Sequence, residues 1–333
     1  MTPGHDKLSR FRPAGPVPRL TCPVPTHEFA LYSLGGATPA VAGVNQFPPF
    51  SPARYSRYKY GSVAAAEDFA RDLATAFLES RPELARAPRL LLASSPYARV
   101  PAAATTLARR LQPRLNAARA RYGLDPAPLV QIERAAASAG DYGTLSAQAR
   151  DRLMAANALS FRRFKPAQVR GAHLLVVDDV RVTGAHQRCL MRASEALPLA
   201  ARAFLYVADF AGVSSSGPDS STGSSPGDGR LDPALEDALN HAAVKTLDDL
   251  AAIVEAGDFT WNVRACKFAL NPVNRGELPR FLRRMPGWFV RGLHRNSCDD
   301  GYARMPGYAP SHAVVRAELT RRSRSPLAAC PPA

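Results

Sequence analysis

Hydrophobic residues in the first two thirds of the chain recur at intervals that predict alternating helices and strands. In residues 64–79 the apolar side chains Phe69, Leu73 and Phe77 return at helical spacing, and residues 89–94 form a short apolar run before a Ser-Pro pair. The same signals predict helices at 102–111, 145–158 and 185–196, and strands at 128–132, 173–177 and 203–208. Because strands separated by helices form parallel sheets with right-handed crossovers, we predict an α/β fold.

Three segments interrupt or flank this pattern. Residues 1–26 are proline-rich without periodicity, residues 214–230 consist almost entirely of Ser, Gly, Pro and Asp, and residues 321–333 are basic and proline-rich. Such compositions bury too little apolar surface to offset the entropy of ordering. We therefore predict disordered tails at 1–26 and 321–333, and a linker or extended loop at 214–230.

The segment after this linker has a different pattern. Helical spacing is visible at 232–241 and 246–255, a β-like start follows at residue 259, and prolines then punctuate the chain. We expect residues 231–320 to form short helical and mixed elements that fold as a cap onto the domain of residues 27–213, rather than around a core of their own.

Charge narrows the choice of partners. The formal net charge is +15 and the pI is about 10.2, mostly from arginine, whose forked donors suit phosphate groups. A nucleic-acid surface and a site for a pyrophosphorylated small molecule both explain this balance. No RNA-recognition signature, zinc finger or basic heptad helix is visible, so nucleic acid is not the expected primary partner.

The remaining composition predicts a soluble, cytoplasmic protein without a membrane segment. There is no run of about 18 apolar residues and no apolar centre of a secretory signal near the start. The cysteines form no CxxC pair and show no metal-ligand spacing with the histidines, so we expect them to be reduced and no structural zinc site to form. They stand at Cys22, Cys189, Cys266, Cys298 and Cys330.

The segment GAHLLVVDDVRVTGAHQ, residues 171–187, carries the clearest chemistry. An apolar strand leads into the paired carboxylates Asp178 and Asp179, then into a turn that ends with Thr183 and Gly184 and opens a helix. Glycine allows backbone amides to approach an anion, and a helix N-terminus favours one. Carboxylates beside a phosphate pocket are expected to bind ribose hydroxyls or to help hold Mg²⁺.

This segment resembles the signature of the type I phosphoribosyltransferases, which bind 5-phosphoribosyl 1-pyrophosphate (PRPP). The resemblance implies a parallel-sheet, Rossmann-like core with a hood or cap. It makes Asp178 and Asp179 the catalytic ribose contacts and the candidate Mg²⁺ ligands. The 5-phosphate is then cupped by Val180, Arg181, Val182, Thr183 and Gly184.

The match departs from the family pattern at two positions. Val182 replaces the usual Thr, Ser or Asp, which argues against a hypoxanthine or guanine enzyme, and His186 replaces a Thr. The extra N-terminal and C-terminal regions are similar to a divergent branch, the phosphoribosyltransferase-like proteins of bacterial tellurite-resistance gene clusters.

Other interpretations of the acid pair stay open. Aspartates at this position also cap helices. Haloacid-dehalogenase phosphatases need Asp-x-Asp, and response-regulator receivers need a separate phosphoacceptor strand, so both fit less well. The ribose hypothesis also requires a particular geometry: an Asp178 side chain buried in an internal salt bridge, or a turn after it that is closed with no cavity, would argue against a sugar site in this turn and against the activity inferred from it.

Further site residues follow from the resemblance. The loop after residues 89–94 is the candidate pyrophosphate site, and residues 134–165, rich in arginine, are either a loop that closes over the reacting centre or a helix with a solvated basic face. Phe210 and Trp261 are candidates for base stacking, with core packing as the alternative. Residues 56–62 either join the hood or form a turn with partly exposed tyrosines. The pyrophosphate candidates are Ser95, Tyr97, Ala98 and Arg99.

Together these features predict a Mg²⁺-dependent phosphoribosyltransferase that moves ribose 5-phosphate from PRPP to a nitrogenous base and releases pyrophosphate. The alternative is a non-catalytic PRPP sensor that binds nucleic acid or a protein through its basic surface. The expected partners are PRPP and a small-molecule base; the sequence does not decide whether the chain forms a homodimer.

Overall fold

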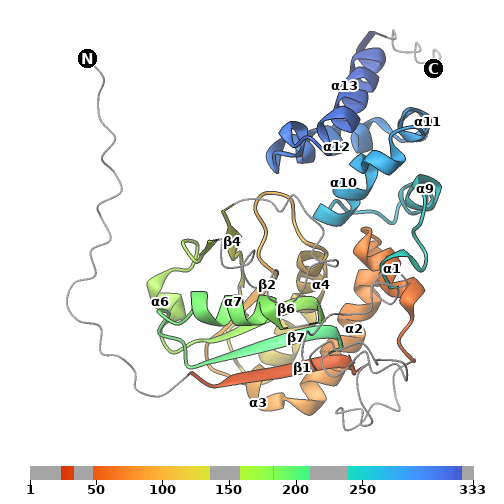
Figure 1. The fold of residues 1–333 in the computed structure, drawn as a ribbon. Coiled ribbons are helices and arrows are strands. Elements are labelled where there is room, and N and C mark those ends of the chain that lie inside the picture. Colours follow the sequence, from red (N-terminus) through yellow and green to blue (C-terminus); the bar gives the residue numbers. More distant parts are fainter. Residues whose placement is uncertain (1–23, 34–47, 136–157, 183, 211–238, 325–333) are drawn as a thin grey trace, which may run out of the picture.

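The computed structural model describes residues 24–33, 48–135, 158–182, 184–210 and 239–324, and its centre is a five-stranded parallel sheet (Figure 1). The strands follow the order β1-β7-β6-β2-β3, so the chain crosses over repeatedly, as the α/β pattern predicts. Their bounds are β1 (Thr26–Ser33), β2 (Leu90–Ser94), β3 (Leu129–Val130), β6 (His173–Arg181) and β7 (Ala201–Asp209).

Helices cover both faces of this sheet. Side chains alternate along each strand: Leu175 and Val177 of β6 pack in the cluster that includes α2 and α4, whereas Leu174 and Val176 pack in the cluster that includes α7. Strands buried on both faces explain the continuous apolar runs in the sequence. The helices of this part are α1 (Pro52–Lys59), α2 (Val63–Ser80), α3 (Pro82–Ala85), α4 (Ala103–Ala120), α6 (Pro166–Val169) and α7 (Ala185–Ala193).

The predicted elements that fall within the described residues of this domain are present with altered lengths, and β1 and α1 are among the elements that were not predicted. Strand β6 continues four residues beyond the predicted end at 177, and α4 runs past Pro113 to Ala120. Edge strand β1 was missed because its sequence, THEFALYS, mixes polar and apolar residues. Helix α1 replaces the expected turn at residues 56–62, and Tyr58 and Tyr60 are each 1% exposed, so the expectation of exposed tyrosines is wrong.

The C-terminal part has its own hydrophobic cluster, in contrast to the expectation of a cap without a core. Phe281, Leu282, Phe289 and Leu293 are buried in it, together with Tyr60, the residue that caps α1 in the first domain. Its last helix extends to Arg324, beyond the predicted start of the basic tail at 321. The helices are α9 (Leu247–Glu255), α10 (Val263–Leu270), α11 (Leu278–Arg284), α12 (Gly287–Asp299) and α13 (Ala309–Arg324).

Backbone hydrogen bonds dock this cap onto the sheet domain beside α1 (Figure 1). The amide of Thr260 donates to the carbonyl of Gly61 at 2.8 Å, and the amide of Val263 donates to the carbonyl of Pro101 at 2.9 Å. The Asp258 carboxylate accepts from the Ala64 amide at 2.6 Å, at the start of α2. The cap is therefore positioned by the same segment that connects α1 to α2.

Acid should weaken the attachment of α13 through Glu318. This carboxylate is 7% exposed and accepts hydrogen bonds from Arg321 and Arg322, and Arg322 also donates to the Met285 carbonyl at 2.9 Å. Hydrogen bonds from Arg321 come first among the causes that lower the pKa of Glu318 from 4.5 to about 2. Because the folded-state pKa is depressed, the stabilisation is present above pH 4.5 and is lost as the pH falls towards 2.

The Glu318→Gln variant should therefore unfold more easily at neutral pH and show a flatter pH dependence of the unfolding midpoint below pH 4.5. Thermal unfolding followed by circular dichroism across this range measures both effects. Parallel pH profiles for the two proteins would contradict this role.

Candidate functional site

The acid pair lies where ligands bind in open parallel sheets, at the carboxyl end of a central strand. Asp178 pairs in register with Tyr206 of β7, and Asp179 follows directly on β6. β6 ends at Arg181, and α7 begins at Ala185, with Gly184 as its N-cap. The strand, turn and helix predicted from residues 171–187 are thus all present.

Asp178 is buried, and its carboxylate is held by internal partners. Oδ1 accepts hydrogen bonds from the Ser95 hydroxyl and from the Asp179 amide, the latter at 2.8 Å, and Oδ2 lies 2.8 Å from Nδ1 of His186. Burial acts to raise the pKa of Asp178, but His186 and these hydrogen bonds outweigh it, so the pKa lies below its usual value. This is the arrangement that argues against a ribose contact for Asp178; it makes Asp178 a link between β2, β6 and α7.

Asp179 is less enclosed and pairs with a residue that sequence reasoning did not single out. Its side chain is 17% exposed, and its Oδ2 contacts the ammonium group of Lys59 at the end of α1. Its Oδ1 accepts from the Val180 amide at 2.7 Å. Burial raises the pKa of Tyr55 and Tyr58 well above 10.0, and the nearby charge of Asp179 adds to this effect. Helix α1 therefore forms one wall beside Asp179.

The predicted phosphate turn is shorter than expected because its first residues belong to the sheet. Val180 and Arg181 pair with Ala208 and Asp209 of β7. The Arg181 guanidinium is directed to Asp209, with Nε at 2.9 Å from Oδ1, and to Glu28 of β1. Thr183 lies outside the described residues, and Val182 and Gly184 remain in the turn. Gly184 has a φ of 69°, which favours glycine, and precedes the first turn of α7.

The candidate pyrophosphate loop is present after β2, but two of its backbone amides are already bonded. The amides of Arg99 and Val100 both donate to Oδ1 of Asp300, each at 3.0 Å, and Asp300 belongs to the cap. Ser95 contacts Asp178, Tyr97 and Ala98 are half-buried, and Arg99 is exposed. Adjacent amides that bind a carboxylate oxygen have the geometry for an anion, which supports an anion site at this loop.

The two aromatic candidates for base stacking are both packing residues. Phe210 is 4% exposed in the main core. Trp261 packs against Phe289 of the cap, with ring centroids 4.5 Å apart, and its indole nitrogen lies against Gly292. Their positions agree with the alternative of core packing, so we assign neither residue to base binding.

The segment expected to close over the site is described only at its ends. β4 (Glu133–Arg134) and β5 (Leu159–Ser160) form an antiparallel pair that brings these ends together, and Arg163 is ion-paired with Glu133 at 2.7 Å. Residues 136–157, including the predicted helix at 145–158 except for its last residue, lie outside the described residues. The β4–β5 pair lies next to the candidate pyrophosphate loop, because Tyr97 forms a bridge with Glu133.

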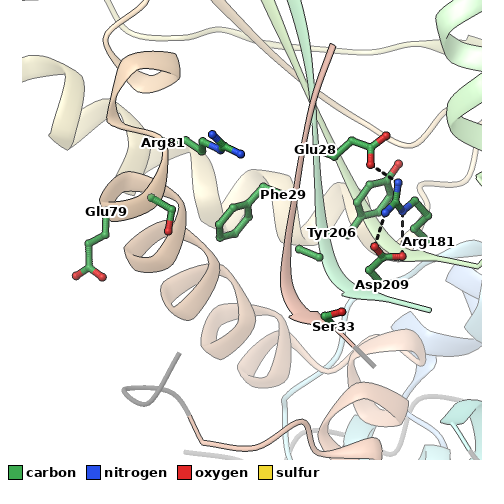
Figure 2. Close-up of a pocket in the computed structure, with 10 residues that line it drawn as sticks. Glu28, Phe29, Ser33, Glu79, Arg81, Arg181, Tyr206 and Asp209 are labelled. Carbon is green, nitrogen blue, oxygen red and sulfur yellow. Dashed lines mark hydrogen bonds and ion pairs between the residues drawn. The ribbon is translucent and has the colours of Figure 1, made fainter. Parts of the chain in front are cut away.

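A pocket of about 590 Å³ lies at edge strand β1 (Figure 2). It is lined by residues of edge strand β1, by the end of α2, and by Arg181, Tyr206 and Asp209. Figure 2 shows Arg181 between Glu28 and Asp209, with Phe29 and Arg81 on the other side of β1. Asp178 and Asp179 do not line this pocket, so we do not assign it to PRPP.

The acid pair alone is a poor Mg²⁺ site in this arrangement. The Asp178 oxygens already accept three hydrogen bonds, and Lys59 occupies Asp179. Mg²⁺ commonly keeps several waters and binds through one or two carboxylates together with substrate phosphates. These residues therefore fit a Mg²⁺ ion that arrives bound to a diphosphate better than a Mg²⁺ ion held by Asp178 and Asp179 alone.

Sequence reasoning missed several contacts of the site because they join distant segments. It named Ser95 only as a pyrophosphate candidate, not as the partner of Asp178. It did not predict that Lys59 of α1 pairs with Asp179, or that Asp300 of the cap bonds the loop after β2. Only His186 stood within the motif itself. The one available signal for Lys59 was its place in the unusual segment SRYKYGS.

Comparisons with known proteins bear on the family of the chain. A search of curated proteins finds no match. In the part of the chain that the structure describes, no helix is both long and apolar enough to cross a bilayer. A family model described as PRTase ComF-like matches residues 29–313, which includes both the sheet domain and most of the cap. The chain therefore belongs to the PRTase ComF-like family, with the phosphoribosyltransferase type of fold that the signature predicted.

Proposed function

We propose that the chain binds PRPP at the carboxyl edge of β6 and β2 and transfers its ribose 5-phosphate group to a nitrogenous base, releasing pyrophosphate. The observation that carries the proposal is the position of Asp179 near the carboxyl end of β6, two residues before the strand ends and the turn to α7 begins. A sugar hydroxyl can then donate to the Asp179 carboxylate, and a phosphoryl group can accept from the amides at the start of α7.

Asp179 is the proposed ribose contact, and Asp178 is a positioning residue. The Asp178 carboxylate accepts a hydrogen bond from the Asp179 amide and also contacts Ser95 and His186. These contacts hold the backbone at Asp179 and so orient the Asp179 side chain. Asp179 has a single side-chain partner, the flexible ammonium group of Lys59, among the contacts of the described residues. When ribose hydroxyls replace Lys59, the released ammonium group can turn to a phosphate.

The 5-phosphate is proposed to bind at the N-terminus of α7. The first turn of a helix presents amides without intrahelical partners, and the helix dipole favours an anion there. Gly184 places no side chain over this end, and the Arg188 guanidinium lies 3.3 Å from the position that a Cβ at Gly184 would take. A cation and backbone donors thus lie on the same side of the turn.

The pyrophosphate group is proposed to bind at the loop after β2. The Asp300 carboxylate on the Arg99 and Val100 amides has the charge and the acceptor atoms of a phosphoryl oxygen. A diphosphate would displace Asp300 or bind the other donors of the loop. Since the cap carries Asp300, a diphosphate that displaces Asp300 would couple binding at this loop to movement of the cap.

The chemistry requires no covalent link to the protein. The bond between C1 and the pyrophosphate oxygen breaks as a bond forms between C1 and a ring nitrogen of the base, and the proton on that nitrogen passes to solvent or a nearby base. Pyrophosphate leaves with the electron pair. The residues contribute by holding ribose and phosphates in place and by neutralising the leaving group, and Mg²⁺ would supply further neutralisation.

A second candidate function, a PRPP sensor without turnover, is favoured by a separate observation. Lys59 already contacts Asp179, His186 already contacts Asp178, and Asp300 already accepts hydrogen bonds from two loop amides. A site so well satisfied without ligand is suited to a switch in which PRPP competes with internal contacts and releases the cap.

The two functions are separated by incubating the full-length protein with PRPP, Mg²⁺ and a panel of nitrogenous bases while pyrophosphate release is followed. We expect release that depends on a base and is lost in the Asp179→Asn variant. PRPP binding with no release for any base would favour the sensor. No PRPP binding at all would reject both functions.

A further inference from the structure

The cap brings together three side chains that ligate transition metals. Nδ1 of His294 lies 2.9 Å from Nε2 of His312, and Sγ of Cys298 lies 3.9 Å from the first and 3.6 Å from the second. All three ligand atoms lie within 4.8 Å of one another. This contact was not expected from the sequence, where the cysteines appeared to lack metal-ligand spacing.

The cluster follows from how two helices of the cap pack. His294 and Cys298 are four residues apart on α12, so they lie on the same face one turn apart. His312 lies in the first turn of α13, which packs against α12. His312 is 6% exposed, whereas Cys298 is exposed, so the cluster is anchored in the cap and open to solvent on one side.

The distances are close to those of a tetrahedral zinc site. With Zn–N about 2.05 Å and Zn–S about 2.3 Å, tetrahedral angles place two nitrogens about 3.3 Å apart and a nitrogen and a sulfur about 3.6 Å apart. The observed nitrogen–sulfur separations match this within a few tenths of an ångström. The two imidazoles need to open by a similar amount, which a small side-chain rotation provides.

The alternative is a purely structural contact, because 2.9 Å also suits a hydrogen bond between two neutral imidazoles. That contact explains the two histidines, but it does not explain why the Cys298 sulfur lies within ligand distance of both. Arg316 on α13 adds a positive charge near His312, which opposes cation binding, whereas a thiolate offsets it.

We propose that His294, Cys298 and His312 bind one Zn²⁺ ion, with the fourth position open to solvent. Two imidazoles and a thiolate are ligands for zinc rather than for Mg²⁺, and they agree with a three-ligand site that keeps an open position. Binding would release the Cys298 thiol proton to solvent as the sulfur–metal bond forms. The site is separate from the proposed PRPP site and does not depend on it.

The ion would cross-link α12 to α13 near the contact between the two domains. Asp300, two residues after Cys298, is the residue that bonds the amides of the loop after β2. Fixing the end of α12 would therefore stabilise the docked position of the cap. Zinc should raise the unfolding temperature of the wild-type chain more than that of a variant lacking one ligand.

Cobalt titration of the full-length, chelator-treated protein tests the site directly, because a thiolate ligand gives Co²⁺ a sulfur-to-metal charge-transfer band. We expect this band in the wild-type chain and in the Cys330→Ser control, its loss in Cys298→Ser, and its displacement by Zn²⁺. His294→Ala, at a half-buried position, should weaken Zn²⁺ binding in a chelator competition at least about tenfold, since even residues that support a ligand commonly contribute that much.

Each variant is used only if its circular dichroism and unfolding temperature show a folded chain. A cobalt band that persists in Cys298→Ser, the absence of any band in the wild-type chain, or unchanged zinc affinity in His294→Ala would overturn the proposal. In those cases the cluster is a hydrogen-bonded histidine pair with a neighbouring thiol.

Discussion

Replacement of Asp179 by asparagine is expected to weaken PRPP binding by about tenfold to a hundredfold and to leave the unfolding temperature nearly unchanged. A hydrogen bond to a charged group contributes about 1.5–3 kcal/mol, which corresponds to this change in the dissociation constant. Stability should change little because Asp179 is partly exposed and an asparagine oxygen can still accept the Val180 amide. Isothermal titration calorimetry with PRPP and Mg²⁺ measures the affinity.

Two further variants separate a ligand contact from general effects of charge. Asp68→Asn removes an exposed carboxylate on α2, where it pairs with Arg71, and should not change the affinity for PRPP. Asp178→Asn should chiefly lower stability, because it disturbs the buried contacts with Ser95 and His186. Tighter PRPP binding by Asp179→Asn would contradict the account, since the acid would then only repel the phosphates.

Replacement of Gly61 by alanine should lower the free energy of unfolding by roughly 3 kcal/mol, the second large effect. Gly61 has a φ of 98°, which disfavours other residues by about 1–3 kcal/mol. An added Cβ would also press into the Thr260 carbonyl oxygen, whose residue donates its amide to Gly61. Urea unfolding followed by fluorescence measures the change.

The matched control for this effect is Gly123→Ala. Gly123 also has a left-handed φ, of 67°, but an added Cβ there has nothing within 4 Å. It should cost only about 1–2 kcal/mol, the cost of the backbone conformation itself. Equal losses in the two variants would show that the close approach of the Thr260 carbonyl oxygen adds nothing to the cost of a side chain at residue 61.

The parts of the fold that were predictable are those in which burial on both faces leaves a continuous apolar signal. β2, β6 and β7 have this signal, and α2 has helical spacing. β1 lacks it because it is an edge strand that carries His27 and Glu28, and α1 was missed because its buried faces are tyrosines rather than aliphatic residues. The core of the cap was missed because three of its helices have only seven to nine residues and prolines lie at the start of two others.

The candidate site was predictable only as far as one continuous segment encodes it. Residues 171–187 placed the acids, the turn and the helix correctly, because their order along the chain fixes their order in space. The Lys59 and Asp300 contacts depend on tertiary packing over 120 and 201 residues of sequence, which no local pattern records. The same limit concealed the histidine–cysteine cluster, because His312 lies on a different helix.

The most direct test of the PRPP proposal is a crystal structure of the full-length protein with PRPP and Mg²⁺. The account predicts the 5-phosphate at the N-terminus of α7, ribose hydroxyls within hydrogen-bond distance of the Asp179 carboxylate, and Lys59 displaced from that carboxylate. PRPP bound in the pocket beside β1, with Asp179 still paired to Lys59, would contradict it.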